Sequence, residues 1–169
     1  MLLITEIMLF SGLISSYFYL RGAHRVWPPF GASELSTAVP AVATAVIAAS
    51  SAALLFAQVS VRRADTGGTR IGLGMAVFMG AVFLAAMVHE WTVTDVKISQ
   101  GIFGGTYYLL TGAHMLHVAV GIGFLVNAFA GSLQGRYTAK NHFGISAAGI
   151  YWHFVTIVWM ILFPVVYLY

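Results

Sequence analysis

The carboxyl-terminal segment is the part of this sequence that most constrains the fold. From Phe143 to Tyr169 it contains no Asp, Glu, Lys or Arg, yet it includes Tyr151-Trp152-His153-Phe154. About 20 helical residues, rising 1.5 Å each, span the hydrocarbon core of a bilayer. The segment therefore predicts a membrane-spanning helix. Because an imidazole ring in lipid needs a polar partner, we expect His153 to face other protein.

The composition of the whole chain agrees with this interpretation. The sequence is 60% hydrophobic and 8% charged, whereas soluble domains carry about 25% charged residues. We therefore predict an integral membrane protein in which residues 1–169 form a single transmembrane domain. The chain has no cysteine, which excludes disulfides, thiolate metal sites, iron–sulfur clusters and c-type haem attachment. Its net charge of +3 is too small and scattered to indicate a nucleic-acid partner.

Five apolar segments predict an all-α, polytopic bundle of five transmembrane helices. The predicted spans are Leu2–Gly22, Ala38–Ser60, Gly72–Trp91, Gly105–Ala130 and Ala147–Leu168. Helices are expected because lipid offers no partner for exposed backbone groups and no segment alternates like a barrel strand. The first span lacks a basic leader and a cleavage site, so we expect it to remain in the mature protein.

The basic residues predict the orientation of the bundle. The second and fourth loops contain five of them: Arg62, Arg63, Arg70, Arg136 and Lys140. The first and third loops contain three: Arg21, Arg25 and Lys97. The excess favours a cytoplasmic N-terminus and an outer C-terminus. A chance excess among so few charges is the alternative.

Two ridges of small residues predict close helix packing. Alanines recur at positions 41, 45, 49 and 53, and Gly72, Ala76 and Gly80 follow the same four-residue spacing. Such ridges let helix backbones approach one another. They suit packing within this bundle, which we favour for either ridge alone, or an interface with another subunit.

Ionisable residues within the spans are the candidate functional groups. We expect Glu6, about 8 Å from the cytoplasmic end of its helix, to be buried rather than exposed near the headgroups. His114 and His117 share one helix flank and suit either metal or haem ligation or packed, hydrogen-bonded core positions; we favour the core positions. His89 and Glu90 lie near an outer helix end, where we expect water to satisfy them.

Depth along the helices predicts which of these groups meet. His117 lies about 18 Å from the outer end of its predicted span, so it shares the inner half of the bilayer with Glu6 and His153. A Glu6–His117 pair, with His153 in the same layer, satisfies these groups at lower cost than leaving each alone in lipid. In the fourth loop, the residues Arg136, Tyr137 and Lys140 suit binding of lipid headgroups. The alternative is that they are the basic and aromatic residues common at any cytoplasmic membrane interface.

Several motifs, in this order, resemble subunit III of the haem–copper cytochrome c oxidases. They are Trp27-Pro28-Pro29, Glu90-Trp91, Phe103 to Tyr108, Thr111 to Val118, Lys140 to Gly144 and Tyr151 to Trp159. The resemblance extends from Glu6 to Tyr167 and corresponds to the last five helices of the seven-helix form, as in the short bacterial form.

The resemblance implies a non-catalytic accessory subunit of the bacterial cytoplasmic membrane. Such a subunit carries no redox cofactor or metal; haem and copper belong to its partners. It packs on subunit I, in a complex with subunit II and in some cases a larger respiratory supercomplex. It binds phospholipid, supports proton uptake and protects the catalytic subunit from turnover inactivation. Glu6 matches the carbodiimide-reactive glutamate of the family, and His117 a histidine associated with it. His114, His153 and Glu90 are expected in the structural polar core.

Three departures weaken parts of this correspondence. Ser146 and Thr156 stand where the family often has carboxylates, and the paired loop histidines are reduced to Asn141 and His142.

The alternative functions for this chain are a subunit III-like companion of nitric oxide reductase, a membrane haem-binding redox protein and an independent transporter. The transporter is disfavoured because the spans lack broken helices and inverted repeats.

Overall fold

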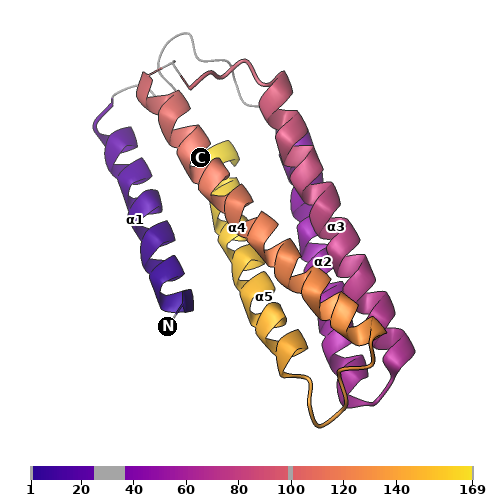
Figure 1. Ribbon diagram of the computed structural model, residues 1–169. Coiled ribbons are helices and arrows are strands. Elements are labelled where there is room, and N and C mark those ends of the chain that lie inside the picture. Colours follow the sequence, from indigo (N-terminus) through magenta and orange to yellow (C-terminus); the bar gives the residue numbers. More distant parts are fainter. Residues whose placement is uncertain (1, 25–36, 99–100, 169) are drawn as a thin grey trace.

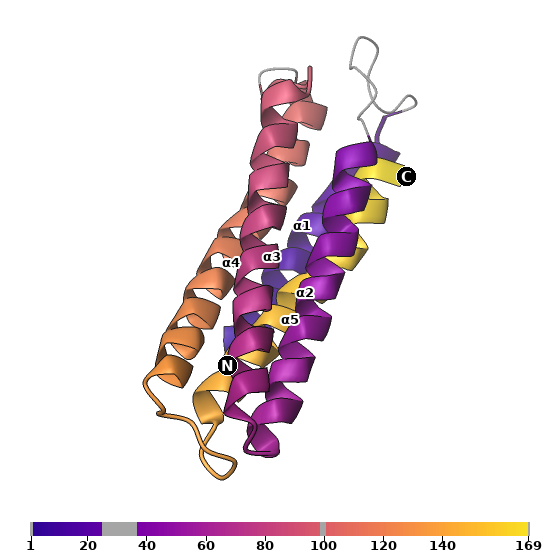
Figure 2. The same ribbon diagram turned by 90° about the vertical axis from the view of Figure 1, so that its right-hand side faces the viewer.

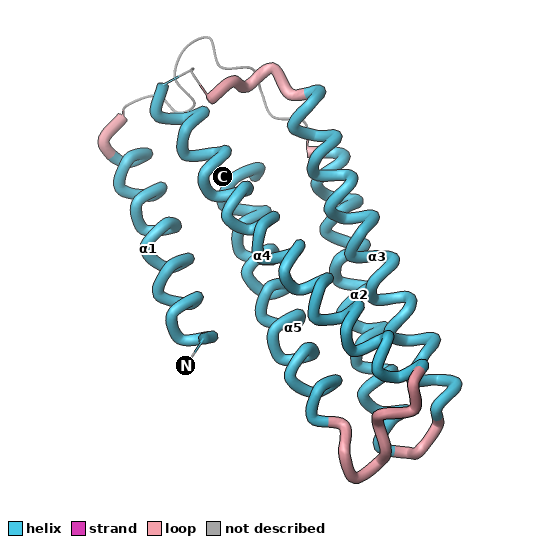
Figure 3. The backbone as a smooth tube through the Cα atoms, in the orientation of Figure 1, coloured by secondary structure: helices cyan, strands magenta, loops and turns pink. Residues whose placement is uncertain are grey.

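The computed structural model describes residues 2–24, 37–98 and 101–168, and within these ranges the chain is helical with no strand (Figure 3). The α-helices are α1 (Leu2–Gly22), α2 (Ala38–Arg62), α3 (Thr66–Val93), α4 (Gly101–Leu133) and α5 (Phe143–Phe163). All five are long and apolar enough to cross a membrane, which confirms the predicted fold class. The motif Trp27-Pro28-Pro29 and Arg25 lie outside the described residues.

Apart from α1, the helices begin or end beyond the apolar segments that predicted them. α3 begins at Thr66, where the side chain of Asp65 accepts a hydrogen bond from the Gly68 backbone N–H over 2.9 Å. Arg70, predicted in a loop, therefore lies in α3, where it donates to the Ser132 and Leu133 carbonyls at the end of α4. Hydropathy marks the part of a helix that lies in hydrocarbon, whereas capping groups decide where the helix stops.

The last span changes its winding at Pro164, which has no backbone N–H to donate. α5 ends at Phe163, and a π-helical turn, η1 (Pro164–Leu168), completes the segment. This turn carries Tyr167 inward, where its hydroxyl lies 2.9 Å from that of Tyr107.

α2 to α5 form the main bundle, and α1 lies to one side against α4 and α5 (Figure 1). The α2–α3 and α4–α5 connections lie together at one end of the bundle. The N-terminal end of α1 stops short of that end, as Figures 1 and 2 both show. The predicted basic loops therefore share one end of the molecule.

The two small-residue ridges differ in what they contact. Gly72, Ala76 and Gly80 are buried, and a Cβ placed on Gly72 would lie 2.8 Å from the Ala57 backbone in α2. This ridge packs within the bundle. The alanines at positions 41, 45 and 49 are instead exposed on the outer face of α2.

Candidate functional site

Glu6 of α1 and His117 of α4 form the candidate site. The Nε2 atom of His117 lies 2.6 Å from Oε2 of Glu6. The side chain of His117 is 13% exposed and that of Glu6 is 20% exposed. The contact expected from helix depth is therefore present. Since α4 spans Gly101–Leu133, His117 lies at its midpoint, as it also does in the predicted span Gly105–Ala130.

The other atoms of His117 are also engaged. Its Nδ1 atom lies 2.6 Å from the Ala113 carbonyl oxygen, one turn earlier in α4. The hydroxyl of Tyr151, in α5, donates to the His117 carbonyl over 3.4 Å. The Phe10 ring of α1 meets the imidazole edge-on, with centroids 5.0 Å apart. Side chains of α1 thus contact this ring, and α5 contacts its backbone. Sequence reasoning did not identify Tyr151 as a neighbour, because helix periodicity does not tell which face of α5 meets α4.

A side recess opens beside this pair. Its volume is about 150 Å³, and its walls come from α1, α4 and α5: Glu6, Leu116, His117, Val120, Phe124 and Tyr151. Most of this lining is apolar, so the polar groups of the pair are the chemically distinctive part of the recess. The pair therefore combines a fixed hydrogen bond with space for side-chain movement.

His153 faces protein, as predicted, but it is not part of this pair. Its partners are on α2, where Nδ1 contacts the Ser51 hydroxyl and Nε2 lies 3.5 Å from the amide oxygen of Gln58. Since an amide oxygen only accepts, Nε2 carries the hydrogen and Nδ1 accepts from Ser51. His153 is therefore satisfied by α2, separately from the Glu6–His117 contact.

His114 is packed as expected but lacks the expected hydrogen bond. Within the described ranges neither ring nitrogen has a partner, and the side chain is fully buried. Its ring stacks on Trp159 with centroids 5.0 Å apart and meets Phe83 and Phe10 edge-on. Sequence reasoning matched polar groups by their depth in the bilayer. In the structure, the aromatic rings around His114 determine which polar groups can reach its two ring nitrogens.

Glu90 corrects the expectation of a water-satisfied residue. It is 1% exposed, and its Oε2 atom has no hydrogen-bond partner among the described residues. Glu90 is thus buried within the bundle, while its neighbour His89 is exposed. Proximity to a helix end therefore did not imply exposure.

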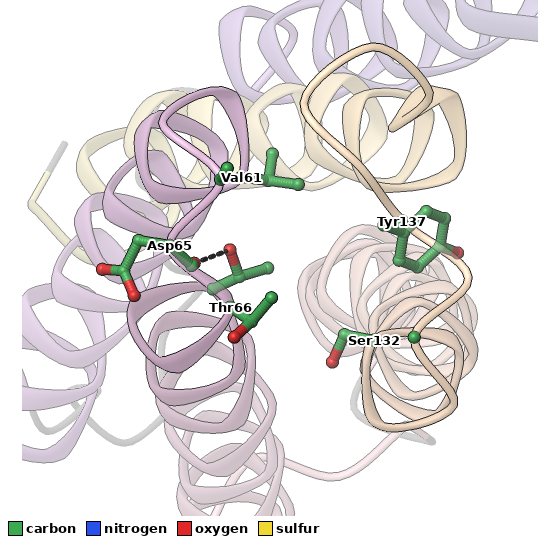
Figure 4. A pocket seen from close by; sticks show the side chains of 8 residues that line it. Val61, Asp65, Thr66, Ser132 and Tyr137 are labelled. Atoms are coloured by element: carbon green, nitrogen blue, oxygen red, sulfur yellow. Dashed lines mark hydrogen bonds between the residues drawn. The ribbon is translucent and has the colours of Figure 1, made fainter.

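The basic loop places its three candidate residues differently. Arg136 and Lys140 are exposed, whereas Tyr137 is half-buried. Cβ atoms placed on Gly131 or Gly144 would lie 3.0 or 2.6 Å from the Tyr137 hydroxyl oxygen. Figure 4 shows the Tyr137 ring lining a small cavity opposite Asp65 and Thr66, with its hydroxyl pointing away from the cavity. That cavity holds about 30 Å³, room for a single water molecule.

The described residues contain no group of three or more His, Cys, Asp or Glu side chains that could hold a metal ion. The histidines that prompted haem as an alternative already have close neighbours. His117 contacts Glu6, His153 contacts α2, and His114 is enclosed by aromatic rings. This arrangement disfavours their use as haem ligands.

Comparison with known proteins identifies the family. The family model for cytochrome c oxidase subunit III matches residues 1–169. The chain is 36% identical to cytochrome c oxidase subunit 3 of Thermostichus vulcanus over 167 residues, which cover 98% of this chain and 83% of that protein. It is 35% identical to the Synechocystis protein, covering 98% and 72% of the two chains. It is 33% identical to the Petromyzon marinus protein, covering 98% and 66%. With five apolar helices and this full-length match, the chain is a multi-pass membrane protein that belongs to the cytochrome c oxidase subunit III family.

Proposed function

We propose that this chain is the non-redox accessory subunit III of a terminal haem–copper cytochrome c oxidase in a bacterial cytoplasmic membrane. Family membership makes it an accessory subunit of the oxidase. Packing on subunit I, lipid binding, support of proton uptake and protection from turnover inactivation are the proposed roles. The named relatives are all oxidase subunits, which favours the oxidase over a nitric oxide reductase complex.

The Glu6–His117 contact is the observation that supports a role in proton uptake. It places a carboxylate and an imidazole 2.6 Å apart, with a recess of about 150 Å³ beside them. These two groups exchange protons more readily than any apolar neighbour in the recess. We propose that they hold protons beside the mouth of the uptake path in subunit I, without forming the path itself.

The exposed outer half of α2 supports lateral docking on a partner helix. Its alanines at positions 41, 45 and 49 form an exposed row of small side chains. Small side chains on a lipid-facing helix allow another backbone to approach closely. This face therefore suits a transmembrane helix of subunit I.

Two basic residues support lipid binding. Arg136 and Lys140 are exposed at the end of the bundle where the α2–α3 and α4–α5 connections lie, and their charges suit a phospholipid phosphate.

The Glu6→Gln variant of the assembled oxidase tests the proton role. We expect unchanged haem content, with an altered pH dependence of turnover or faster inactivation during turnover. Glu90→Gln is the matched control, because it alters a buried carboxyl on α3 that does not contact His117; it should keep both wild-type properties. If Glu6→Gln matches the wild type in pH dependence and inactivation, the pair has only a structural role.

A further inference from the structure

A polar seam between α2 and α5 is not used by the proposed proton pair. It comprises Ser51 and Gln58 of α2 and His153 of α5, all half-buried, and we call these three residues the α2–α5 seam. His153 lies about 15 Å along α5 from its start at Phe143, and Ser51 lies about 16 Å along α2 from its end at Arg62. The contact between Ser51 and His153 is therefore near the middle of a hydrocarbon core about 30 Å thick.

Gln58 leaves one end of its carboxamide free. Its Oε1 atom lies 3.5 Å from Nε2 of His153. Its Nε2 atom lies against Gly149 of α5, where an added Cβ would overlap it. Within the described residues this nitrogen has no hydrogen-bond partner, and it is not among the enclosed polar atoms of the bundle. The seam therefore presents an unused hydrogen-bonding group on the outside of the bundle.

Lipid acyl chains are a poor covering for these groups. Hydrocarbon offers no hydrogen bond, so a half-exposed imidazole or carboxamide is destabilised against it. Surface hydroxyls avoid this cost by bonding to their own helix, as Ser16 does to the Gly12 carbonyl over 2.8 Å. His153 and Gln58 instead reach across to a neighbouring helix and remain partly exposed. We therefore expect protein, rather than lipid, to cover the seam.

Exposed apolar side chains border the seam on both helices. Leu55 lies one turn from Ser51 on α2, and Ile150 and Ile157 lie one turn before and after His153 on α5. All three apolar residues are exposed. Residues three or four positions apart share one side of a helix, so these side chains flank the polar ones on the outside of the bundle. The surface thus combines hydrogen-bonding groups with an apolar border, as contacts between membrane helices do.

We propose that the α2–α5 seam is a docking surface for a transmembrane helix of the large oxidase subunit. That helix places a hydrogen-bonding side chain against the free end of the Gln58 carboxamide, and its apolar side chains cover Leu55, Ile150 and Ile157. This docking rests on the proposed function as an oxidase subunit, and it extends the proposed α2 contact to α5 and to a partner helix of defined chemistry.

Photocrosslinking in the assembled oxidase tests the docking surface. A benzophenone amino acid replaces, one at a time, Leu55 or Ile157 beside the seam, and Phe78 of α3 or Leu109 of α4 as controls. The four side chains are between 52% and 69% exposed, so exposure alone does not favour either group. We expect crosslinks to the large subunit from Leu55 and Ile157, and none to that subunit from Phe78 and Leu109.

The possible failures of this experiment are distinguishable. Crosslinks to the large subunit from Phe78 or Leu109, without any from the two seam positions, would overturn the docking surface and leave the proposed function intact. Lipid adducts alone at both seam positions would have the same meaning. If no large subunit co-purifies with the chain, the proposed function itself fails, and the docking surface fails with it.

Substitution of Gln58 tests the hydrogen bond to the partner. Gln58→Met keeps the length of the side chain and removes the carboxamide. It should lower retention of the large subunit about threefold, the size typical of a hydrogen bond between membrane helices. Ser51→Ala is the matched control, because it also removes a contact of His153 but leaves Gln58 unchanged; it should retain the partner like the wild type. Native mass spectrometry measures retention. Equal retention in the two variants would overturn the proposed contact, because water at the membrane surface would then satisfy the carboxamide.

Discussion

Trp152 of α5 lies directly against Gly80 of α3. A Cβ placed on Gly80 would be 2.6 Å from the Cη2 atom of the indole. The Cε3 and Cζ3 atoms of the same ring lie against Gly121 of α4, and its Nε1–H donates to the Ser50 hydroxyl of α2 over 3.0 Å. One fully buried side chain thus joins four helices. The two glycines are needed for space at this point, because any side chain there would displace the ring.

Gly80→Ala tests this close approach. We expect a loss of about 1–3 kcal/mol in the free energy of unfolding, because the added methyl overpacks the site. Gly123→Ala, in α4, is the matched control, since no atom lies within 4 Å of its Cβ position. It should stabilise the helix by up to about 1 kcal/mol. Unfolding of the purified chain in mixed micelles measures both, and equal effects would show that the indole can move.

A double-mutant cycle tests the link between α5 and α2. Trp152→Phe and Ser50→Ala each remove one side of the indole–hydroxyl hydrogen bond. We expect a coupling free energy of about 0.6 kcal/mol, as found for hydrogen bonds between membrane helices. The same cycle on Trp159 and Thr44, whose Nε1 and Oγ1 atoms lie 2.8 Å apart, provides an independent measurement. Additive single effects in both cycles would contradict the idea that these bonds hold α5 to α2.

Substitution on the exposed alanine face tests docking on the partner. Ala45→Leu should weaken co-purification with the large oxidase subunit, because a branched side chain separates the two helix backbones. Ala85→Leu is the control, at an exposed position on α3. Retention of the partner is measured by native mass spectrometry. If Ala45→Leu retains as much partner as Ala85→Leu, the docking surface lies elsewhere.

Removal of the two exposed basic groups tests lipid binding. Arg136→Ala with Lys140→Ala should lower the number of retained phospholipids, because each basic group near the membrane surface contributes about 1 kcal/mol toward anionic headgroups. Native mass spectrometry counts the bound lipids. Arg136→Lys with Lys140→Arg keeps the charges and should retain them. Unchanged lipid content in the alanine variant would contradict the proposed site.

The sequence by itself determined the membrane-spanning segments and several inward-facing groups. Charge-free length is sufficient to predict a span, because the thickness of the hydrocarbon core sets the number of apolar residues required. The need of polar groups for partners in lipid also predicted the Glu6–His117 contact and the inward orientation of His153. Both inferences use position along a helix axis, which can be counted from the sequence.

Only the tertiary structure decided which helix faces meet. It assigned Ser51 and Gln58 to His153, left the His114 ring nitrogens without partners among the described residues, and buried Glu90. Lipid and protein interior are equally apolar, so hydropathy does not distinguish a face that packs against protein from one that faces lipid. The rotation of each helix about its axis is set by side-chain packing, as where Trp152 fits against Gly80 and Gly121.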